Sequence, residues 1–276
     1  MIRLTVLGSG SSGNATFLEC GDTRLLIDAG FSAKRLTEKL EAMGVSPDSL
    51  SGILVTHEHT DHVQGIPVFV KKWGTPVYAT RRTREEMRKC TDAIPWRFFE
   101  SGDIFQIGGV RVTSFPISHD AADPVGFRLD YRHFRYGHLS DVGHISPIIR
   151  SCLTDLQVLF VESNYDPHLL ETNPNRPWQT KQRIASAHGH LSNEQAGEFV
   201  TSILNEKLSD IILGHLSREC NTPELALENM RNILEIKKEH SPYLHCATGI
   251  GLDRWITLAH APSAGNSVLL QQEFDW

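Results

Sequence analysis

Short apolar runs with the spacing of β-strands alternate along this chain with segments that have the spacing of amphipathic helices. The apolar runs predict strands at 2–7, 15–20, 23–28, 52–56, 76–80, 103–107, 110–117, 125–131, 157–163 and 210–215. Apolar positions that share a helix face predict helices near 32–43, 62–72, 81–90, 144–151, 177–187, 192–206 and 222–239. Clusters of strands with helices between them occur twice, which predicts a four-layered α/β fold, with two mixed sheets packed face to face and helices outside.

The length and the composition predict one large domain. A chain of 276 residues with 40% hydrophobic residues can bury a sizeable core as a single domain. No repeat or low-complexity tract is visible, and the proline-containing loop at 172–178 is too short to link two domains. We therefore expect a single domain over 1–276, with the residues after about 246 as a tail that we cannot place.

Charge and cysteine usage exclude some classes of protein. A net charge of −6 and a pI near 6.1 argue against a generically basic protein that coats nucleic acid, although local basic patches remain compatible with them. The five cysteines are scattered and never form a C-x-x-C pair, which argues against a disulfide framework. No secretion signal and no apolar run of membrane-spanning length is present, so we expect a cytoplasmic protein without membrane contact.

The glycine-rich stretch "GSGSSG" at 8–13 has the form of a dinucleotide-binding fingerprint. Such a fingerprint must open a helix that faces the pyrophosphate, whereas here the chain continues into the apolar run at 15–20. A hairpin loop in which glycines allow positive φ is therefore the better interpretation. A loop this rich in Ser and Asn can still lie beside an active site.

The segment "HEHTDH" at 57–62 concentrates metal-binding chemistry after the apolar run at 52–56. His57, His59, Asp61 and His62 supply four donor groups within six residues. Burying them unpaired would cost several kcal/mol, and a strand end offers no packing reason for them. Imidazole and carboxylate suit zinc, manganese or iron, and the absence of cysteine favours a catalytic site over a closed structural one.

This H-x-H-x-D-H motif, with "LLIDAG" upstream at 25–30, resembles the metallo-β-lactamase fold superfamily, whose fold has four αββα layers. The resemblance implies a centre of two divalent ions, Zn²⁺ or Mn²⁺ with iron as a further option. Their ligands would be His57, His59 and His119 for one ion and Asp61, His62 and His215 for the other, with Asp141 as the bridge. Asp28 matches the aspartate that orients a ligand histidine.

Seven motifs spread over about residues 3 to 230 resemble the YycJ (WalJ) group, exonuclease-like members related to ribonuclease J and ribonuclease Z. Glu162 in "FVESNYD" and His190 in "HGHLSN" match positions that nucleases of the superfamily add to the metal core. The resemblance implies a catalytic role for both residues, in handling the proton of the leaving oxygen, and for Asp61 at the metal-activated water. It also implies a DNA exonuclease with 5′ to 3′ polarity.

The resemblance further implies nucleic acid as the partner, as single-stranded or end-bearing DNA, together with proteins of repair or replication. Basic runs at 81–89, 128–135 and 176–183 would supply phosphate contacts if they line one rim, and Trp178 could stack on a base. Ser217 and Asn221 follow His215 closely, and we expect them to contact substrate. The oligomeric state is not predicted.

Three alternatives stay open from the sequence. A small-molecule metallohydrolase acting on a cyclic phosphodiester, thioester or lactone would use the same centre, and the cleavage of an ester or lactam has less need of Glu162 and His190. A non-catalytic nucleic-acid-binding scaffold would usually have lost ligands, and a flavodiiron-type oxidoreductase would carry a carboxylate at position 59. His133 and His138 depart from the family pattern, and His144 and His188 are alternative ligand candidates.

Overall fold

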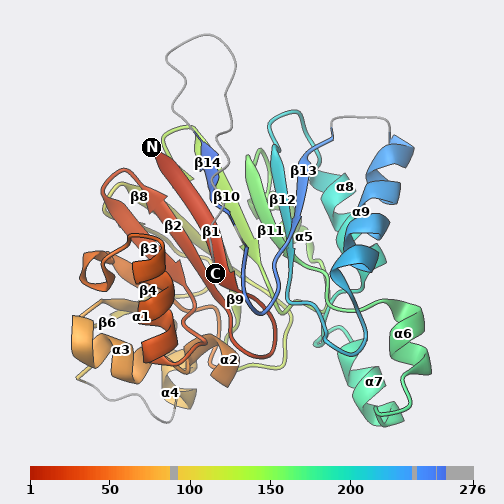
Figure 1. The fold of residues 1–276 in the computed structure, drawn as a ribbon, viewed down its shortest axis with the longest axis horizontal. Coiled ribbons are helices and arrows are strands. Elements are labelled where there is room, and N and C mark those ends of the chain that lie inside the picture. The colour runs from red at the N-terminus through yellow and green to blue at the C-terminus, as the bar shows by residue number, and fades with distance from the viewer. Residues whose placement is uncertain (88–92, 238–240, 253, 259–276) are drawn as a thin grey trace. The chain divides into compact units, whose positions relative to one another are not determined.

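The computed structural model describes residues 1–87, 93–237, 241–252 and 254–258. These residues fall into two compact units. Figure 1 labels their helices and strands. The first unit comprises Met1–Glu100, Phe105–Arg111 and the described residues from Gly249 onward. The second unit comprises Ser101–Ile104 and Val112–Thr248.

A mixed seven-stranded sheet with the strand order β14-β1-β2-β3-β4-β5-β6 forms the centre of the first unit. Its strands are β1 (Ile2–Gly8), β2 (Ala15–Cys20), β3 (Thr23–Ile27), β4 (Gly52–Leu54), β5 (Val77–Ala79), β6 (Trp96–Phe98) and β14 (Ile256–Leu258). From β14 to β3 the neighbours are antiparallel, and from β3 to β6 they are parallel.

The two longest helices of the first unit bury their apolar residues against this sheet. The helices of this unit are α1 (Ala33–Ala42), the 3₁₀ turn η1 (Pro47–Ser49), α2 (Thr60–Val63), α3 (Ile66–Trp73) and α4 (Arg81–Glu86). Leu36 and Leu40 of α1 and Phe69 of α3 are fully buried in one core with Phe17 and Ile53 of the strands. This spacing of apolar residues along α1 is the one that the sequence pattern predicts.

A second mixed sheet has the strand order β13-β12-β11-β10-β9-β8-β7. Its strands are β7 (Ile104–Ile107), β8 (Val110–Pro116), β9 (Val125–Tyr131), β10 (Phe134–Leu139), β11 (Val158–Glu162), β12 (Asp210–Gly214) and β13 (Tyr243–Cys246). The strands β10 to β13 are parallel, whereas β9 runs antiparallel to β10. Every residue of β11 and β12 is buried, which explains the apolar runs at 158–161 and 211–213.

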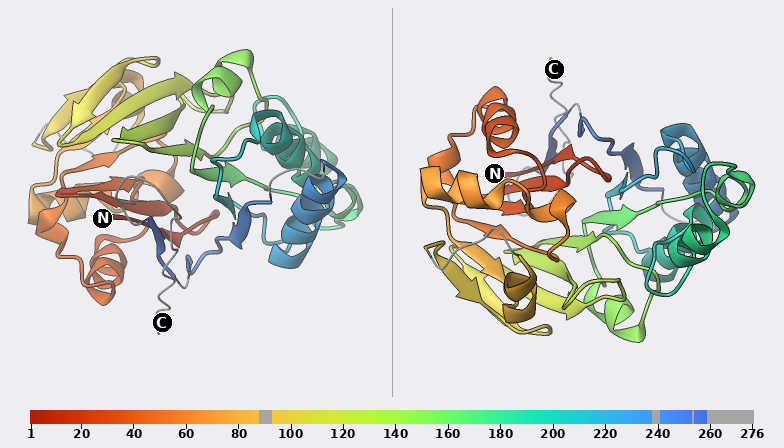
Figure 2. Two further views of the ribbon diagram at one scale, coloured as in Figure 1. Left: turned by 90° about the horizontal axis from the view of Figure 1, so that it is seen from above. Right: turned by 90° about the horizontal axis from the view of Figure 1, so that it is seen from below.

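The helices of the second unit are α5 (Pro147–Cys152), α6 (Pro167–Thr172), α7 (Trp178–Ile184), α8 (Asn193–Ile203) and α9 (Pro223–Lys237). Figure 2 shows α8 and α9 side by side. Phe199 of α8 and Met230 of α9 share a core with Leu159 and Leu213 of the strands. Gly197 of α8 faces the side chain of Ile233 on α9, which lets the two helices approach closely.

Two mixed sheets with flanking helices confirm the predicted α/β class, and β2 and β9 have the predicted bounds. The helix predicted near 62–72 is divided into α2 and α3, because Pro67 lacks an N–H and lies in the first turn of α3, which begins at Ile66, instead of continuing α2. Part of the unplaced tail has a position, since Ile256–Leu258 pair with β1 as β14. Residues 88–90 of the helix predicted at 81–90 and residues 238–239 of the one predicted at 222–239 lie outside the described residues.

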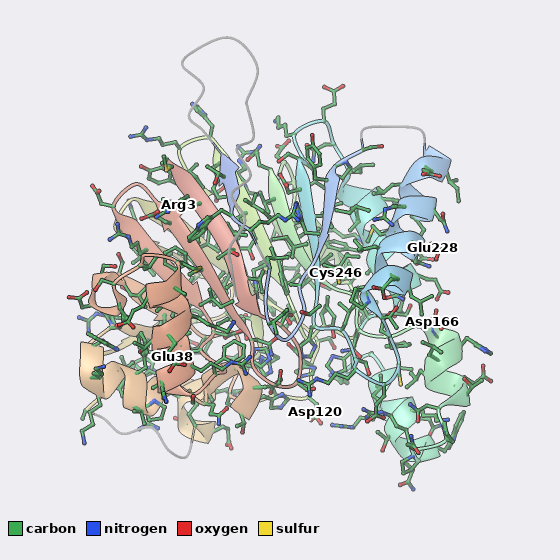
Figure 3. The ribbon with its side chains drawn as sticks, viewed as in Figure 1. Arg3, Glu38, Asp120, Asp166, Glu228 and Cys246 are labelled. Atoms are coloured by element: carbon green, nitrogen blue, oxygen red, sulfur yellow. The ribbon has the colours of Figure 1, made fainter. Side chains whose placement is uncertain are left out.

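The four cysteines of the described residues are free thiols. Burial raises the pKa of Cys20 and of Cys246, which ends β13 (Figure 3), to about 12. These two thiols therefore stay protonated at neutral pH and are poor metal ligands. In the part of the chain that the structure describes, no helix combines the length and the apolar character that a membrane span requires.

Candidate metal centre

The carboxyl end of β4 leads directly into four of the predicted ligands. After Leu54, His57 and His59 lie in the loop, and Asp61 and His62 lie in α2. His57 and His62 are fully buried, and their ring centroids are 4.1 Å apart. Nε2 of His62 lies 3.6 Å from Oδ2 of Asp61. The first unit thus brings together a compact set of imidazole and carboxylate donors, which is the chemistry of a zinc, manganese or iron site.

Asp28, the residue after β3, fixes the proton on one of these histidines directly. Oδ2 of Asp28 lies 2.8 Å from Nδ1 of His62, and Oδ1 accepts the backbone N–H of Thr56 at 2.9 Å. Because a carboxylate only accepts hydrogen bonds, Nδ1 of His62 carries the hydrogen. The lone pair of His62 is then on Nε2, the nitrogen that the Asp28 contact leaves for a metal.

Thr56 extends the same control to His57. Its hydroxyl donates to Oδ2 of Asp28 at 2.9 Å and lies 3.0 Å from Nδ1 of His57. Since the single hydroxyl hydrogen points to Asp28, the oxygen accepts from Nδ1 of His57, whose lone pair is therefore also on Nε2. One buried aspartate thus sets the tautomers of two predicted ligands.

The glycine-rich loop after β1 reaches this cluster through Asn14. The backbone N–H of Asn14 donates to the carbonyl of Asp61 at 2.8 Å, and its side-chain nitrogen lies 3.0 Å from Nε2 of His62. Gly10 and Gly13 have φ of 116° and 139°, and the chain continues into the antiparallel strand β2. The prediction of a hairpin loop, and not a dinucleotide fingerprint, is confirmed.

The carboxyl ends of three parallel strands form a second cluster in the second unit. Asp141 follows β10, Glu162 ends β11 and His215 follows β12. One donor atom from each of these residues and from His190 lies within 4.8 Å of the others. Oδ1 of Asp141 is 3.3 Å from Nδ1 of His215 and 3.9 Å from Nε2 of His119. Parallel strands gather these donors because their carboxyl ends meet at one edge of the sheet.

Within this second cluster, Glu162 contacts the rings of both His190 and His215. It is fully buried, and Oε2 accepts the N–H of Val142 at 2.8 Å. Oε1 lies 2.6 Å from Nδ1 of His190 and 3.1 Å from Nδ1 of His215. Burial opposes the ionisation of Glu162, but the charge and hydrogen bonds of His190 and His215 outweigh it and lower the pKa of this carboxyl. A single carboxylate oxygen therefore orients both rings.

Neighbouring groups also hold His119, Asp141 and His215. Nδ1 of His119 lies 3.2 Å from the carbonyl of Gly189, which accepts its hydrogen and directs the lone pair to Nε2. The hydroxyl of Ser140 donates to Oδ2 of Asp141 at 2.7 Å, and the amide of Asn164 donates to the backbone carbonyl of His215 at 2.7 Å.

Three of the predicted site residues have left-handed backbone conformations, which residues other than glycine rarely adopt. The φ angles are 62° at Asp28, 53° at Asp141 and 54° at His215. Each residue directly follows, or lies one residue beyond, the end of a strand. Such strain of order 1–3 kcal/mol per residue persists where the surrounding structure holds it, and it gathers at functional sites.

The residues predicted to contact substrate differ in their surroundings. Asn221 is buried, and its amide donates to the carbonyl of Ser163 and to Oδ1 of Asn193, both at 2.8 Å, so it fixes the turn and has no spare donor for a ligand. Ser217 is half-buried, and its hydroxyl oxygen accepts the N–H of Cys220. Trp178 is 66% exposed at the start of α7.

The basic run at 128–135 cannot supply a rim to the second cluster. It spans the turn between β9 and β10, whereas Asp141 follows the other end of β10, roughly 20 Å away at the rise of a strand. Arg128 and Arg135 also form ion pairs with Asp130 and Asp155. The run at 176–183 instead includes α7, whose last residue, Ile184, accepts the N–H of His190 at 2.9 Å.

The alternative histidines are not part of either cluster. His144 and His188 are exposed, as is His133 in the turn before β10. His138 is buried, where Nδ1 lies 2.8 Å from the hydroxyl of Tyr136 and the ring stacks on Phe160. His138 therefore has a structural place in the core of the second unit.

Three residues that hold predicted ligands in place are not among the predicted site residues: Thr56, Ser140 and Asn164. Thr56 directly precedes the H-x-H-x-D-H motif, and that adjacency was the only available signal for it. Ser140 and Asn164 carry no signal, because a polar residue next to a strand end is ordinary in any sequence.

Comparisons with known proteins agree with this geometry. Residues 23–209 match the family model described as the beta-lactamase superfamily domain. Exodeoxyribonuclease WalJ of Streptococcus pneumoniae is 36% identical over 237 residues, which cover 84% of this chain and 88% of that protein. Exodeoxyribonuclease YycJ of Bacillus anthracis is 34% identical over 239 residues, which cover 86% and 90%.

Among solved structures, the metallo-beta-lactamase fold protein YhfI from Bacillus subtilis matches with a TM-score of 0.70. The match covers 90% of this chain and 98% of that chain at 16% identity, so it is a likeness of fold alone.

Proposed function

Because the chain belongs to the metallo-β-lactamase superfamily and is a hydrolase homologous to exodeoxyribonucleases, we propose that it removes nucleotides from DNA ends by metal-dependent hydrolysis. The substrate in this proposal is single-stranded or end-bearing DNA, digested from 5′ to 3′. The similarity to two proteins named exodeoxyribonuclease over more than four fifths of the chain supports DNA over a small-molecule ester.

The proposal assigns two divalent ions, Zn²⁺ or Mn²⁺, to seven side chains, which are His57, His59, Asp61, His62, His119, Asp141 and His215. Hydrogen bonds from neighbouring groups place the lone pairs of His57, His62, His119 and His215 on Nε2, which fits metal binding. When bound, two such ions lower the pKa of a water toward neutrality and stabilise negative charge on phosphate oxygens.

The Glu162–His190 pair is the observation that carries the choice of a phosphodiester. Glu162 accepts the Nδ1 hydrogen of His190 at 2.6 Å, so the ring is oriented with Nε2 as its second reactive atom. His190 is 21% exposed at its side chain, whereas Glu162 is fully buried, so the histidine is the member of the pair that can meet substrate. We assign to His190 the donation of a proton to the leaving oxygen, a step typically worth about 10²- to 10⁴-fold in rate.

The test is the degradation of 5′-labelled single-stranded DNA by the purified protein in Mn²⁺, with EDTA as the chemical control. We expect His190→Ala to lower kcat by about 10²-fold or more. We expect Asp61→Ala or His119→Ala to abolish turnover and to lower the bound metal, measured by elemental analysis, while circular dichroism shows a retained fold.

His188→Ala is the matched control, because His188 is an exposed histidine two residues from His190. It should degrade DNA at the wild-type rate. Protein that holds two metals but cleaves neither DNA nor RNA of the same sequence would overturn the proposal and favour a small-molecule hydrolase. A fully active Asp61→Ala protein would refute the assignment of Asp61.

A further inference from the structure

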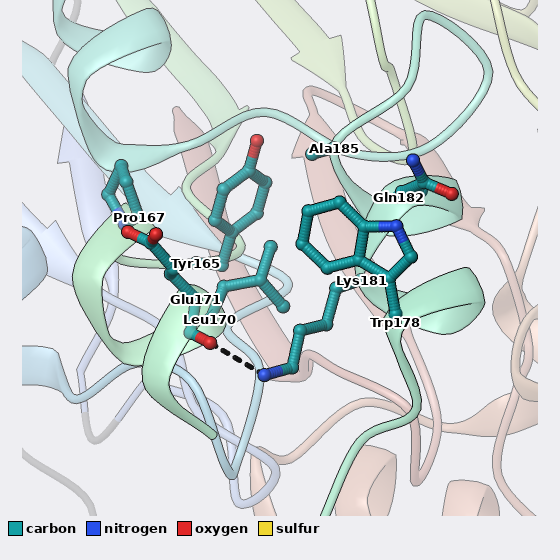
Figure 4. A pocket seen from close by; sticks show the side chains of 8 residues that line it. All are labelled: Tyr165, Pro167, Leu170, Glu171, Trp178, Lys181, Gln182 and Ala185. Carbon is teal, nitrogen blue, oxygen red and sulfur yellow. Dashed lines mark hydrogen bonds between the residues drawn. The ribbon is translucent and has the colours of Figure 1, made fainter. Parts of the chain in front are cut away.

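We propose that the hollow between α6 and α7 is a stacking pocket for one base of a single-stranded DNA substrate. The inference rests on the proposed function and deepens it by assigning a place to a nucleotide near the bond that is cut. The hollow has a volume of about 520 Å³, which is within the range of roughly 300–1,000 Å³ found for small-ligand sites. Its lining includes Tyr165, Leu170, Trp178 and Lys181 (Figure 4).

The walls of this pocket are mostly apolar and aromatic, and the polar side chains that also line it are those of Glu171, Lys181 and Gln182. Tyr165 is 5% exposed and Leu170 is 4% exposed, and both belong to a small core cluster with buried Cys220, so this side of the pocket is fixed. Trp178, in contrast, is 66% exposed although indole is the largest apolar side chain. A base that stacks on Trp178 would cover this ring, because every base has a flat face that an aromatic side chain can contact.

Positive charge on α7 fits the phosphates that flank such a base. Nζ of Lys181 donates to the carbonyl of Glu171 at 2.6 Å at the pocket, which directs its ammonium group to this region. Arg183 on the same helix is 69% exposed at its side chain, with a distant ion pair of 3.8 Å to Asp120. An acidic protein thus carries cations next to an apolar pocket, which is the combination that single-strand-binding surfaces use.

Few groups of the pocket can read the edge of a base. Gln182 and the phenol of Tyr165 are its uncharged hydrogen-bonding side chains. Burial and the nearby charges of Glu162 and Glu194 raise the pKa of Tyr165, so its phenol remains a hydrogen-bond donor at neutral pH. We therefore expect binding that depends on the presence of a base more than on its identity.

Short backbone connections link this pocket to the Glu162–His190 pair. The carbonyl of Ile184, at the end of α7, accepts the N–H of His190 at 2.9 Å. The carbonyl of Tyr165, three residues after Glu162, accepts the N–H of Asn193 at 2.9 Å. Since both walls of the pocket are attached to the segment that carries His190, a base in the pocket belongs to a nucleotide close to the scissile phosphate.

The test measures binding apart from cleavage. A short deoxythymidine oligonucleotide is titrated into metal-loaded His190→Ala protein, and tryptophan fluorescence and anisotropy are recorded. We expect quenching of fluorescence that is lost in Trp178→Phe, although Trp178→Phe still binds. We expect Trp178→Ala to bind about 5- to 100-fold more weakly, and Tyr243→Ala, which removes an exposed aromatic ring of β13, to bind unchanged.

Oligonucleotides with one abasic site, moved along the strand, complete the test. One position should weaken binding to the Trp178-containing protein and have no further effect on Trp178→Ala. Equal binding of DNA by Trp178→Ala and the parent protein would overturn the pocket assignment, as would a parent protein that binds no single strand. If the wild type binds single-stranded DNA through Trp178 but does not cleave it, the proposed nuclease function is wrong and the pocket assignment stands.

Discussion

Thr56 has a single hydroxyl hydrogen, and its position decides which nitrogen of His57 can bind a metal. The hydrogen points to Asp28, so the oxygen accepts from Nδ1 of His57 and leaves Nε2 with the lone pair. Groups of this kind, one step away from a metal ligand, commonly contribute 10- to 100-fold to metal affinity or activity. Asp28 and Thr56 therefore fix the tautomers of His57 and His62 without being predicted metal ligands themselves.

Thr56→Val removes the hydroxyl and keeps the shape of the side chain. Without the hydroxyl, Nδ1 of His57 loses its acceptor, so we expect metal affinity to fall about tenfold. Competition with a chromogenic chelator measures this affinity. Thr56→Ser is the matched control because it keeps the hydroxyl, and it should retain near-normal affinity. Metal binding by Thr56→Val that equals the wild type would disprove the relay from Asp28 to His57.

At the scale of elements, β1, β2 and β3 are linked by a row of charges as well as by their backbones. Glu19 of β2 lies opposite Arg3 of β1 and Arg24 of β3 in the strand register. Nε of Arg3 donates to Glu19 at 2.6 Å and Nε of Arg24 at 2.7 Å, and the glutamate side chain is 9% exposed. Figure 3 labels Arg3 on β1. Such direct cross-strand pairs stabilise a sheet.

This row predicts a pH-dependent part of the stability. Burial opposes the ionisation of Glu19, but hydrogen bonds from Arg24 and Arg3 outweigh it and lower its pKa below 4.5 in the folded protein. The folded state therefore binds fewer protons than the unfolded state in this range. The stabilisation by Glu19 is present above about pH 4.5 and is lost as the pH falls through the lowered pKa.

We expect Glu19→Gln to reduce the free energy of unfolding by about 1–2 kcal/mol at pH 7. The difference from wild type should shrink as the pH falls below about 4.5, because protonated Glu19 resembles glutamine. Urea unfolding of both proteins at several pH values measures it. A difference that stays constant over this range would show that the charge of Glu19 is not the cause.

At the scale of the whole molecule, a net charge of −6 means that the proposed DNA substrate would be attracted by local cations and not by the protein's overall field. The exposed Arg183 on α7 is such a cation, whereas Lys207 precedes β12 and thus lies at the end of that strand opposite to His215. The two side chains are comparably exposed, and each has one carboxylate partner.

Binding of single-stranded DNA should therefore weaken steeply with salt. Each phosphate contact contributes about 0.7 to the slope of log affinity against log salt concentration. We expect Arg183→Ala to lower this slope by about 0.7 and Lys207→Ala to leave it unchanged. Anisotropy titrations over a range of salt concentrations measure both. A flat dependence in the wild type would contradict an electrostatic contribution to DNA binding.

The sequence by itself predicted most strands and four of the metal-ligand candidates, because each of these features lies within one short stretch of neighbouring residues. Apolar runs identified most strands, since a buried strand must be apolar over several neighbouring positions. The H-x-H-x-D-H motif identified four donors within six residues. Some short elements were not predicted. Helix α6 has six residues and strand β14 has three, too few for a repeating pattern of apolar positions to be recognised. Pro67 signals the break between α2 and α3, whereas the spacing of apolar residues by itself predicts one continuous helix.

Only the tertiary structure decided which residues far apart in the chain contact one another. The sequence placed Glu162, His190 and His215 after separate segments, and the structure shows one carboxylate oxygen within 3.1 Å of both imidazoles. The structure likewise shows that the amide of Asn221 donates its hydrogens to Ser163 and Asn193. It also shows that Trp178 and Tyr165 line the same pocket. The physical reason is that composition and period constrain which face of an element is buried, whereas a hydrogen bond depends on the positions of atoms that the folded chain brings together.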